Sequence, residues 1–577
     1  ENTWRCEESC CCACICVCVR ACFLRQMERV TSSFVGGCTV IHDAVSGFTL
    51  DVSGFGEDVA VLASKYSHSL KAALHFMEQL EGGEIVNRTS VASESENRSV
   101  DHYNLRMQEE RVPGKSLDAS LKQWAEIREA VEGIRQGGRF KDVLFNGIGG
   151  SYLGPLMIVV GILGVDFNLR KDLPLHMHFV SNTDPEGFAD VLKKVDLEST
   201  LLVNMSKSGS TAETKGNMDC FNDLLRAAGL KPGDHNIAIT TEGSPFDKYA
   251  RENDFLHIFH MFNETGGRTS VCSAIGMVPA AFAGLEFDEF LRGMSHMDEL
   301  TRMPAADKNP AFVVASLIQN LTNRVGPRNM IVLGYHDHLR EFSHYLQQLY
   351  MESLGKEYTV DGILRPYGLT VFGGVGTGEQ HAFMQQVQKG LRDCFVRFAH
   401  FRRRHVDFAN EKAGSVGRQL LAFVRGTQNA LASNGVPYMD ATFEECNMFN
   451  WGMMIALEER IVSFLAIFNN VNAYDQPGVQ DGKLAADAVN SLSKLIESTL
   501  AQWDSGKEWQ GDAQEFASDV LQGRPGEVNV LNVEGILSDM EGNLTVPNAY
   551  PTLRDKISIT RSYNPTEGRF VYSLAKL

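Results

Sequence analysis

Six small polar residues, Ser206 to Thr211 (SKSGST), directly follow the apolar run Leu201 to Met205 and precede a stretch with helical periodicity. A strand that delivers such a loop to a helix N-terminus directs backbone N–H groups, hydroxyls and the Lys207 ammonium at one point. That arrangement favours a phosphate group. The loop lacks the Gly-Lys-Ser/Thr ending of a nucleotide P-loop and has no GxGxxG spacing, so we expect a phosphorylated small molecule rather than a nucleotide.

A second glycine-rich loop, Gly147 to Ser151 (GIGGS), also follows an apolar run and leads into a helical pattern. Its glycines let the backbone approach a ligand closely, and Ser151 opens the following helix with its hydroxyl and amide. Such turns are common for purely structural reasons. Two of them in one sheet, however, favour a common ligand site.

An arginine and a carboxylate provide groups that can transfer a proton and stabilise the resulting charge. Arg268 stands on a Gly-Gly turn before a helix of small residues, where a guanidinium can stabilise an oxyanion or enediolate. Gln348 and Glu352 share one face of a predicted helix at i, i+4. A carboxylate in a partly dry cleft can serve as a general base. A surface arginine and a solvated glutamate are the alternative interpretations.

Three more candidates lie further along the chain. The segment GEQHAF predicts His381 in the first turn of a helix, where the helix dipole lowers the pKa of an imidazole and keeps the ring available as acid or base. Gln476 and Lys483 lie around a Pro-Gly turn in NAYDQPGVQDGK. A lysine at such a place is usually an ordinary solvated helix residue.

The elements that must position these residues follow a regular rhythm. Apolar runs at 142–145, 177–180, 201–205 and 236–241 are each followed by a polar loop and a helical pattern. A second set at 330–333, 369–372 and 394–398 is interleaved with helices such as 339–354 and 380–389. The pattern predicts an α/β protein with mainly parallel sheets between helices, and ligands beyond the carboxyl ends of the strands.

The chain of 577 residues is too long for one ordinary core. We expect a smaller phosphate-binding domain at 116–285 and a larger domain at 286–510 that carries Glu352 and His381. The remaining parts are a cysteine-rich head at 1–40, a helical segment at 41–115 that packs on the large domain, and a C-terminal extension at 511–577.

Charge and cysteine content restrict the partners and the compartment. The net charge of −18 disfavours nucleic acid and anionic membranes, so local cations and dipoles must hold any anionic ligand. Outside the head, only Cys220, Cys272, Cys394 and Cys446 occur, and scattered cysteines indicate a reducing compartment. We expect a protein of the cytoplasm or the plastid stroma that is not secreted.

The head contains nine of the 13 cysteines, between Cys6 and Cys38, and the first methionine is Met27. We interpret it as a partial or mistranslated start, or as the remnant of a targeting peptide. A metal cluster is the alternative, although no histidine lies among the cysteines between Cys6 and Cys38.

Six segments in this order resemble the glucose-6-phosphate isomerase family: GIGGSYLGP, SKSGSTAET, GGRTSVCSAIG, MESLGK, GEQHAF and DQPGVQDGK. The resemblance runs from about Asp101 to Lys483, and GGRTS and DHYNLR look closest to the plastid and cyanobacterial branch. It implies two sugar-isomerase-type (SIS) α/β domains with helical extensions. It also implies a homodimer in which His381 serves the active site of the other subunit.

The resemblance further implies a role for each candidate. Glu352 would move a proton between C2 and C1 of glucose 6-phosphate and fructose 6-phosphate, and Arg268 would stabilise the cis-enediolate. His381 and Lys483 would open and close the sugar ring. The groups expected to hold the substrate are Gly150, Ser151, Ser206, Lys207, Ser208, Thr211, Gln348 and Gln476. This step of glycolysis and gluconeogenesis needs no metal or organic cofactor, and ligand spacing indicates none.

The chain also departs from the family pattern. Residues 263–265 (Asn-Glu-Thr) replace a more usual aromatic residue and valine, so we expect a different packing beneath Arg268. Two alternative functions for this chain use the same fold. One is an isomerase that acts on both glucose and mannose phosphates, and the other is a non-catalytic sugar-phosphate sensor. A sensor could dispense with Glu352, His381 and Lys483 together, and all three are present.

Overall fold

The computed structural model describes residues 29–35, 38–326, 328–522 and 529–577, so most of the cysteine-rich head lies outside the described residues. The chain forms two compact units, Glu1–Asp475 and Gln476–Leu577. We expected the C-terminal extension to begin at 511, but the second unit begins at Gln476. The reason is that helix α17 (Pro477–Ala501) buries Ile496 and Leu500 in the core of that unit.

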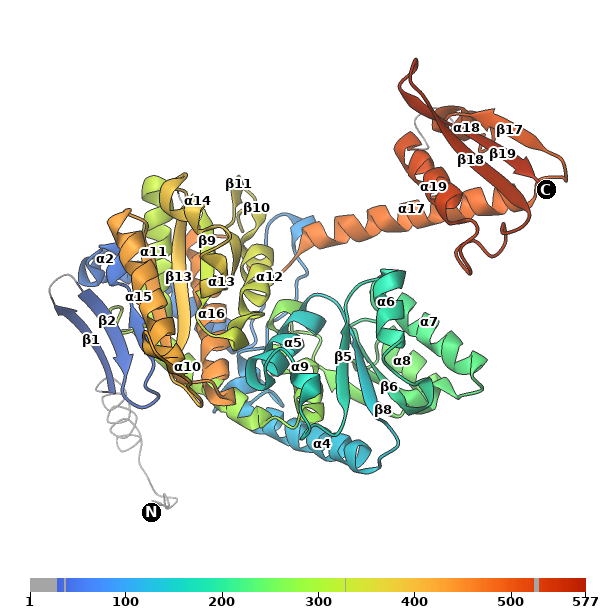
Figure 1. Ribbon diagram of the computed structural model, residues 1–577. Coiled ribbons are helices and arrows are strands. Elements are labelled where there is room, and N and C mark those ends of the chain that lie inside the picture. The colour runs from blue at the N-terminus through green and yellow to red at the C-terminus, as the bar shows by residue number, and fades with distance from the viewer. Residues whose placement is uncertain (1–28, 36–37, 327, 523–528) are drawn as a thin grey trace. The chain divides into compact units, whose positions relative to one another are not determined.

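The first sheet has the strand order β5-β4-β6-β7-β8, and every neighbouring pair is parallel (Figure 1). Its strands are β4 (Asp142–Asn146), β5 (His176–Val180), β6 (Thr200–Met205), β7 (Asn236–Thr241) and β8 (His257–Met261). Its helices are α4 (Leu117–Gln136), α5 (Gly150–Leu163), α6 (Pro185–Leu192), α7 (Ala212–Ala227), α8 (Pro245–Glu252) and α9 (Ala274–Phe282).

Both faces of this sheet are covered because its strands are apolar at successive positions. In β4, Val143 and Phe145 join the core that includes α4, α5 and α9, whereas Leu144 joins the core of α6, α7 and α8. Side chains alternate between the faces of a strand, so a continuous apolar run requires helices on both sides. The strand-loop-helix pattern predicted from the sequence is confirmed here.

The second sheet has the order β1-β2-β3-β16-β13-β9-β12. Its parallel part contains β9 (Asn329–Gly334), β12 (Thr370–Val375), β13 (Cys394–Arg403) and β16 (Tyr438–Glu445). Antiparallel strands β1 (Val30–Val35), β2 (Cys38–Asp43) and β3 (Thr49–Asp51) extend it from β16. We did not predict β16 or these N-terminal strands, which join the sheet only through the pairing of β3 with the distant strand β16.

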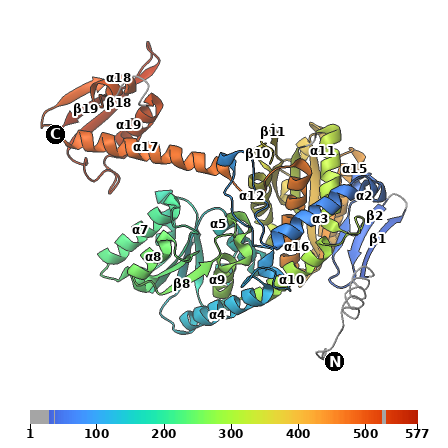
Figure 2. The ribbon, with the colours of Figure 1, turned by 180° about the vertical axis from the view of Figure 1, so that it is seen from behind.

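Helices surround the second sheet and join it to the first. They are α2 (Val59–Lys65), α3 (Ser67–Glu81), α10 (Phe287–Thr301), α11 (Pro310–Val325), α12 (Phe342–Leu354), α13 (Gly376–Glu379), α14 (Met384–Lys389), α15 (Val416–Ser433) and α16 (Met448–Asn469). Within the segment 41–115, which we expected to be helical, α2 and α3 are separate helices, and α3 lies beside α16 (Figure 2). Short hairpins are β10 (Lys356–Tyr358) with β11 (Leu364–Tyr367), and β14 (Ala409–Asn410) with β15 (Gly414–Ser415).

Helices α10 and α16 pack backbone against backbone through glycine. A Cβ atom on Gly452 would lie 2.0 Å from the carbonyl oxygen of Phe290, and one on Gly293 would lie 1.9 Å from that of Phe449. Only glycine permits this approach, and it brings the buried face of α16 under both sheets.

The second unit is a small α+β arrangement with its own core. Its three-stranded antiparallel sheet has the order β17-β19-β18. Besides α17, it contains β17 (Glu508–Gly511), α18 (Ala513–Asp519), α19 (Val530–Asn543), β18 (Ile557–Asn564) and β19 (Arg569–Lys576).

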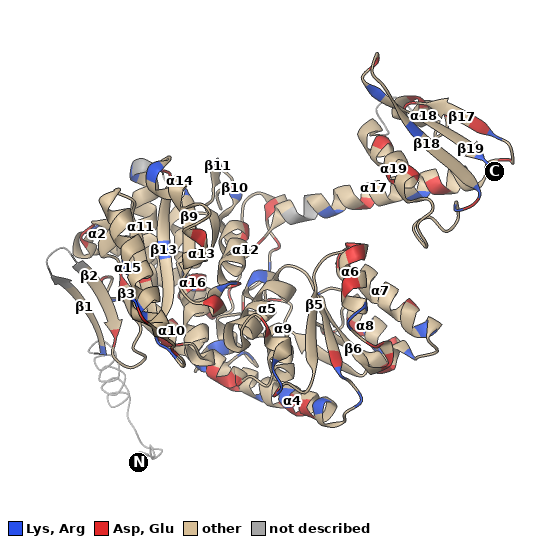
Figure 3. Cartoon of the chain, in the orientation of Figure 1, with Lys and Arg blue, Asp and Glu red and all other residues tan. Residues whose placement is uncertain are grey.

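Charged residues are concentrated on surface helices, as on α4, while the strands of the first sheet carry few (Figure 3). Among the described residues, none of the helices combines the length and the apolar character needed to cross a membrane.

Candidate active site

The SKSGST loop forms a compact turn between β6 and α7. Ser206 is buried, and its Oγ accepts a hydrogen bond from the Gly209 N–H at 3.0 Å and lies 3.3 Å from Thr211 Oγ1. Gly209 has φ +73°, and a Cβ there would lie 2.3 Å from that of Phe246, so glycine is required. Thr211 is the N-cap of α7, which places the loop at a helix N-terminus.

The GIGGS loop adjoins it because β4 and β6 are parallel neighbours. A Cβ on Gly147 would lie 3.3 Å from that of Met205, at the carboxyl end of β6. A Cβ on Gly150 would lie only 1.8 Å from the Gly267 carbonyl oxygen. The glycines therefore let the N-terminus of α5, with Ser151, lie directly against the turn that carries Arg268.

Lys207 is partly buried, and both Arg98 and several carboxylates lie near it. Burial, followed by the charge of Arg98, lowers the pKa of Lys207 to about 8, although Glu96, Asp101 and Glu264 act in the opposite direction. A lysine that is partly desolvated and near a second cation is stabilised by a bound anion. Arg98 was not among the candidates from the sequence, since it lies outside every recognisable motif.

Arg268 connects the first sheet to α12. Its Nε donates to Ser353 Oγ at 2.8 Å, and its Nη1 lies 3.3 Å from Glu352 Oε2. The other oxygen of Glu352 accepts from Gln348 Nε2 at 3.3 Å. Arg268 is 3% exposed, whereas the Glu352 side chain is 27% exposed. The carboxylate is thus held from both sides but remains open to a ligand.

Lys356 was missed by sequence reasoning. Its Nζ donates to the backbone carbonyls of Glu352 and Ser353, the latter at 2.9 Å, and so caps the C-terminus of α12. Burial, followed by the charge of Arg268, lowers its pKa to about 7. The sequence signal that could have indicated this role is the position of Lys356 directly after Gly355, the glycine that ends the helix.

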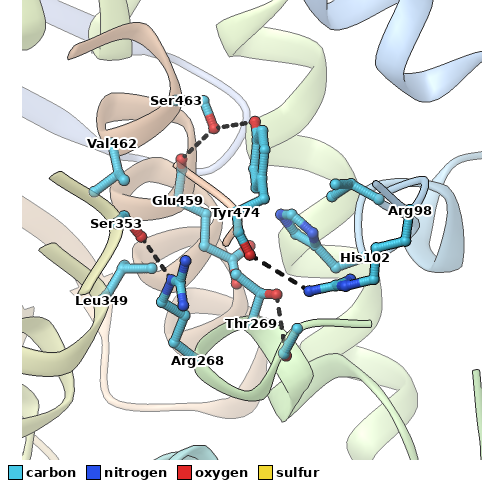
Figure 4. A pocket seen from close by; sticks show the side chains of 12 residues that line it. Arg98, His102, Arg268, Thr269, Leu349, Ser353, Glu459, Val462, Ser463 and Tyr474 are labelled. Atoms are coloured by element: carbon cyan, nitrogen blue, oxygen red, sulfur yellow. Dashed lines mark hydrogen bonds between the residues drawn. The ribbon is translucent and has the colours of Figure 1, made fainter. Parts of the chain in front are cut away.

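A small cavity of about 20 Å³ lies beside Arg268 (Figure 4). It is lined by His102, Glu459 and Ser463 among others, and neither ring nitrogen of His102 has a hydrogen-bond partner among the described residues. This volume holds one water molecule, which needs roughly 10–15 Å³. A hexose phosphate does not fit in this space.

The altered segment 263–265 packs through polar contacts. Thr265 Oγ1 donates to Asp101 Oδ1 at 2.7 Å, and Lys115 Nζ lies 2.8 Å from Glu264 Oε2. Arg98 donates to the Glu264 carbonyl at 2.7 Å. The segment before Arg268 is therefore held by hydrogen bonds and an ion pair.

The remaining candidates lie elsewhere. His381 is exposed on the turn between α13 and α14, and not in the first turn of a helix as predicted. The reason is that the long helix that we expected at 380–389 begins only at Met384. Gln476 and Lys483 belong to the second unit, and Lys483 is exposed there. Their roles stay predictions.

Replacing Ser353 by Ala should lower the free energy of unfolding by about 1–3 kcal/mol, because the buried Arg268 guanidinium loses an acceptor. Ser343→Ala is the matched control, since Ser343 is equally buried on α12 and its Oγ has no hydrogen-bond partner within the described part of the chain. Urea denaturation measures both. Equal destabilisation by the two substitutions would contradict the importance of the Arg268 contact.

Two kinds of comparison with known proteins point to one family. The family model described as Phosphoglucose isomerase matches residues 66–508. A glucose-6-phosphate isomerase from Thermosynechococcus vestitus is 37% identical over 468 residues, covering 79% of this chain and 86% of the relative. Glucose-6-phosphate isomerase 1, chloroplastic, from Arabidopsis thaliana is 38% identical over 472 residues, covering 79% of this chain and 74% of the relative.

A solved structure gives the same result at the level of the fold. The crystal structure of a glucose-6-phosphate isomerase from Chlamydia trachomatis matches with a TM-score of 0.70 and 27% identity, covering 82% of this chain and 91% of that one. The α/β fold expected from the sequence is thereby confirmed. The chain belongs to the phosphoglucose isomerase family.

Proposed function

We propose that this chain interconverts glucose 6-phosphate and fructose 6-phosphate, as an aldose-ketose isomerase of glycolysis and gluconeogenesis. The observation that carries the proposal is the Glu352 carboxylate, which Gln348 and Arg268 hold while leaving it partly exposed. The names of the relatives support the substrate pair.

The chemistry follows from the two charged groups. Glu352 takes the proton from C2 and returns it to C1, or the reverse, so the same carboxylate is base and then acid. Negative charge develops on the oxygens of C1 and C2 in the enediolate between these steps. The Arg268 guanidinium is fixed by Ser353 and by the carbonyl of Ala473, so it stabilises that charge without moving.

The phosphate serves for binding and does not react. Ser206, Lys207, Ser208 and Thr211 provide hydroxyls, amides and an ammonium at the N-terminus of α7. Gly150 and Ser151 add the N-terminus of α5. Binding at this end orients the carbon chain, so that C1 and C2 are set against Glu352.

We further propose a homodimer in which His381 of each copy serves the active site of the other copy. His381 and Lys483 open the sugar ring. Gln476 binds a hydroxyl group of the sugar. Two observations support an interface. His381 is exposed, and the segment 406–423 exposes large apolar side chains to between 42% and 71%, namely Val406, Phe408, Val416, Leu421 and Phe423.

The plastid stroma or the cytosol is the compartment that we propose. Cys220, Cys272, Cys394 and Cys446 are free thiols, which suits a reducing environment. One relative is named chloroplastic.

Glu352→Gln should lower kcat for fructose 6-phosphate isomerisation by about two to four orders of magnitude, because the amide cannot accept the C2 proton. A coupled assay for glucose 6-phosphate measures the rate. Glu357→Gln is the control, since this exposed glutamate lies five residues further on. Equal rates for wild type and Glu352→Gln would rule out Glu352 as the base.

The KM for fructose 6-phosphate should rise as the pH increases through about 8. Below that pH Lys207 is protonated and attracts the phosphate dianion, and above it the ammonium is lost. Lys207→Met should have a KM about 10–100-fold higher with little change between pH 7.5 and 9.5. Lys215→Met, at an exposed site on α7, should behave like wild type. A pH profile unchanged by Lys207→Met would contradict this role.

Mixing two inactive variants tests the shared active site. A dimer of one Glu352→Gln subunit and one His381→Ala subunit has one site with both changes and one intact site, so it should recover about half of the wild-type rate. Differently tagged subunits allow purification of the mixed dimer, and a dimer of two differently tagged Glu352→Gln subunits is the control. No recovery would mean that His381 acts within its own subunit.

A further inference from the structure

Two histidines and a cysteine that the proposed reaction does not use lie together at one edge of the second sheet. His336 and His338 follow β9, and Cys446 directly follows β16. Both strands are parallel neighbours of β13, so their carboxyl ends meet at the same edge. One ligand atom from each of the three residues lies within 4.8 Å of the others, and all three side chains are half-buried.

The distances are close to those of a metal centre. Cys446 Sγ lies 3.7 Å from His338 Nδ1. Zinc bonds of about 2.3 Å to sulfur and 2.0–2.1 Å to nitrogen in a tetrahedral centre place such atoms about 3.6 Å apart. The His336 and His338 rings are 4.9 Å apart in an edge-to-face arrangement. Small side-chain rotations therefore bring all three ligands to one ion.

Three hydrogen-bond donors surround the carbonyl oxygen of Gly161, although it can accept only two hydrogen bonds with its lone pairs. It lies 3.0 Å from His338 Nδ1, 3.1 Å from Cys446 Sγ and 3.2 Å from Trp451 Nε1. A carbonyl oxygen has two lone pairs. If the thiol and His338 Nδ1 turn to an ion, Trp451 still satisfies this oxygen, so metal binding leaves no buried acceptor unpaired.

We propose that His336, His338 and Cys446 bind one Zn²⁺ ion, with a water molecule as the fourth ligand. The thiol releases its proton to solvent, and the two imidazoles bind as neutral ligands. Nitrogen and thiolate ligands select zinc over magnesium or calcium, which prefer oxygen. The sequence did not indicate this site, because 108 residues separate His338 from Cys446.

The site would lie where the two halves of the first unit meet, beside Gly161. Gly161 lies on α5, whose N-terminus carries Gly150 and Ser151. His338 lies in the turn before α12, which carries Glu352. A metal at this place is structural and takes no part in proton transfer.

The test requires a readout specific to Cys446, because the nine thiols between Cys6 and Cys38 would also bind zinc. The full chain is stripped with a chelator, treated with zinc or left metal-free, and exposed to an alkylating reagent. Mass spectrometry then gives the rate at each thiol. Zinc should slow alkylation of Cys446 at least tenfold and leave Cys220, an exposed thiol on α7, unchanged.

His338→Gln removes a ligand but keeps the thiol, so zinc should no longer protect Cys446 in this variant. His344→Gln is the control, because this exposed histidine on α12 lies outside the cluster. Equal alkylation of wild-type Cys446 with and without zinc would overturn the proposal, as would full protection in His338→Gln. Anomalous diffraction at the zinc edge tests the wild type directly, and a zinc-loaded crystal without a peak between these residues would also overturn it.

Discussion

The guanidinium of Arg268 is buried between segments that lie far apart in the sequence. Removing a charged group from water costs several kcal/mol unless the charge is paired and hydrogen-bonded. Its acceptors come from α12, through Ser353 and Glu352, and from the carbonyls of Ala473 and Asp475. Arg268 can therefore be buried only after these segments have converged, and the same convergence assembles the candidate site.

A second buried network holds the helices behind this site. Arg106 lies 2.7 Å from Asp298 on α10 and also pairs with Glu459 on α16. Arg460 lies 2.9 Å from Glu81 and 3.2 Å from Asp298. Removing one member would leave a buried charge unpaired, which costs more than the net stability of the pair. The network thus favours one relative position of α3, α10 and α16.

Much of the fold was predictable because its signals are local. The run Leu201 to Met205 is buried on both faces, and its small polar loop forms the expected turn before a helix. Asp184 as N-cap and Pro185 in the first turn likewise begin α6 after the loop that follows β5. The strands β1 to β3, the boundary at Asp475 and the cap formed by Lys356 were not predictable, because each depends on contacts with distant residues.

The sequence by itself determined the residue types, the phosphate-binding loop and the order of the elements, since backbone hydrogen bonding and apolar periodicity act over a few residues. It also carried enough shared segments to identify the family. Only the tertiary structure decided that Arg268 contacts Glu352, that Arg98 lies near Lys207, and that His338 meets Cys446. Those contacts join segments that lie at least 84 residues apart in the sequence. No local sequence pattern records such contacts, because they depend on burial and charge in the folded chain.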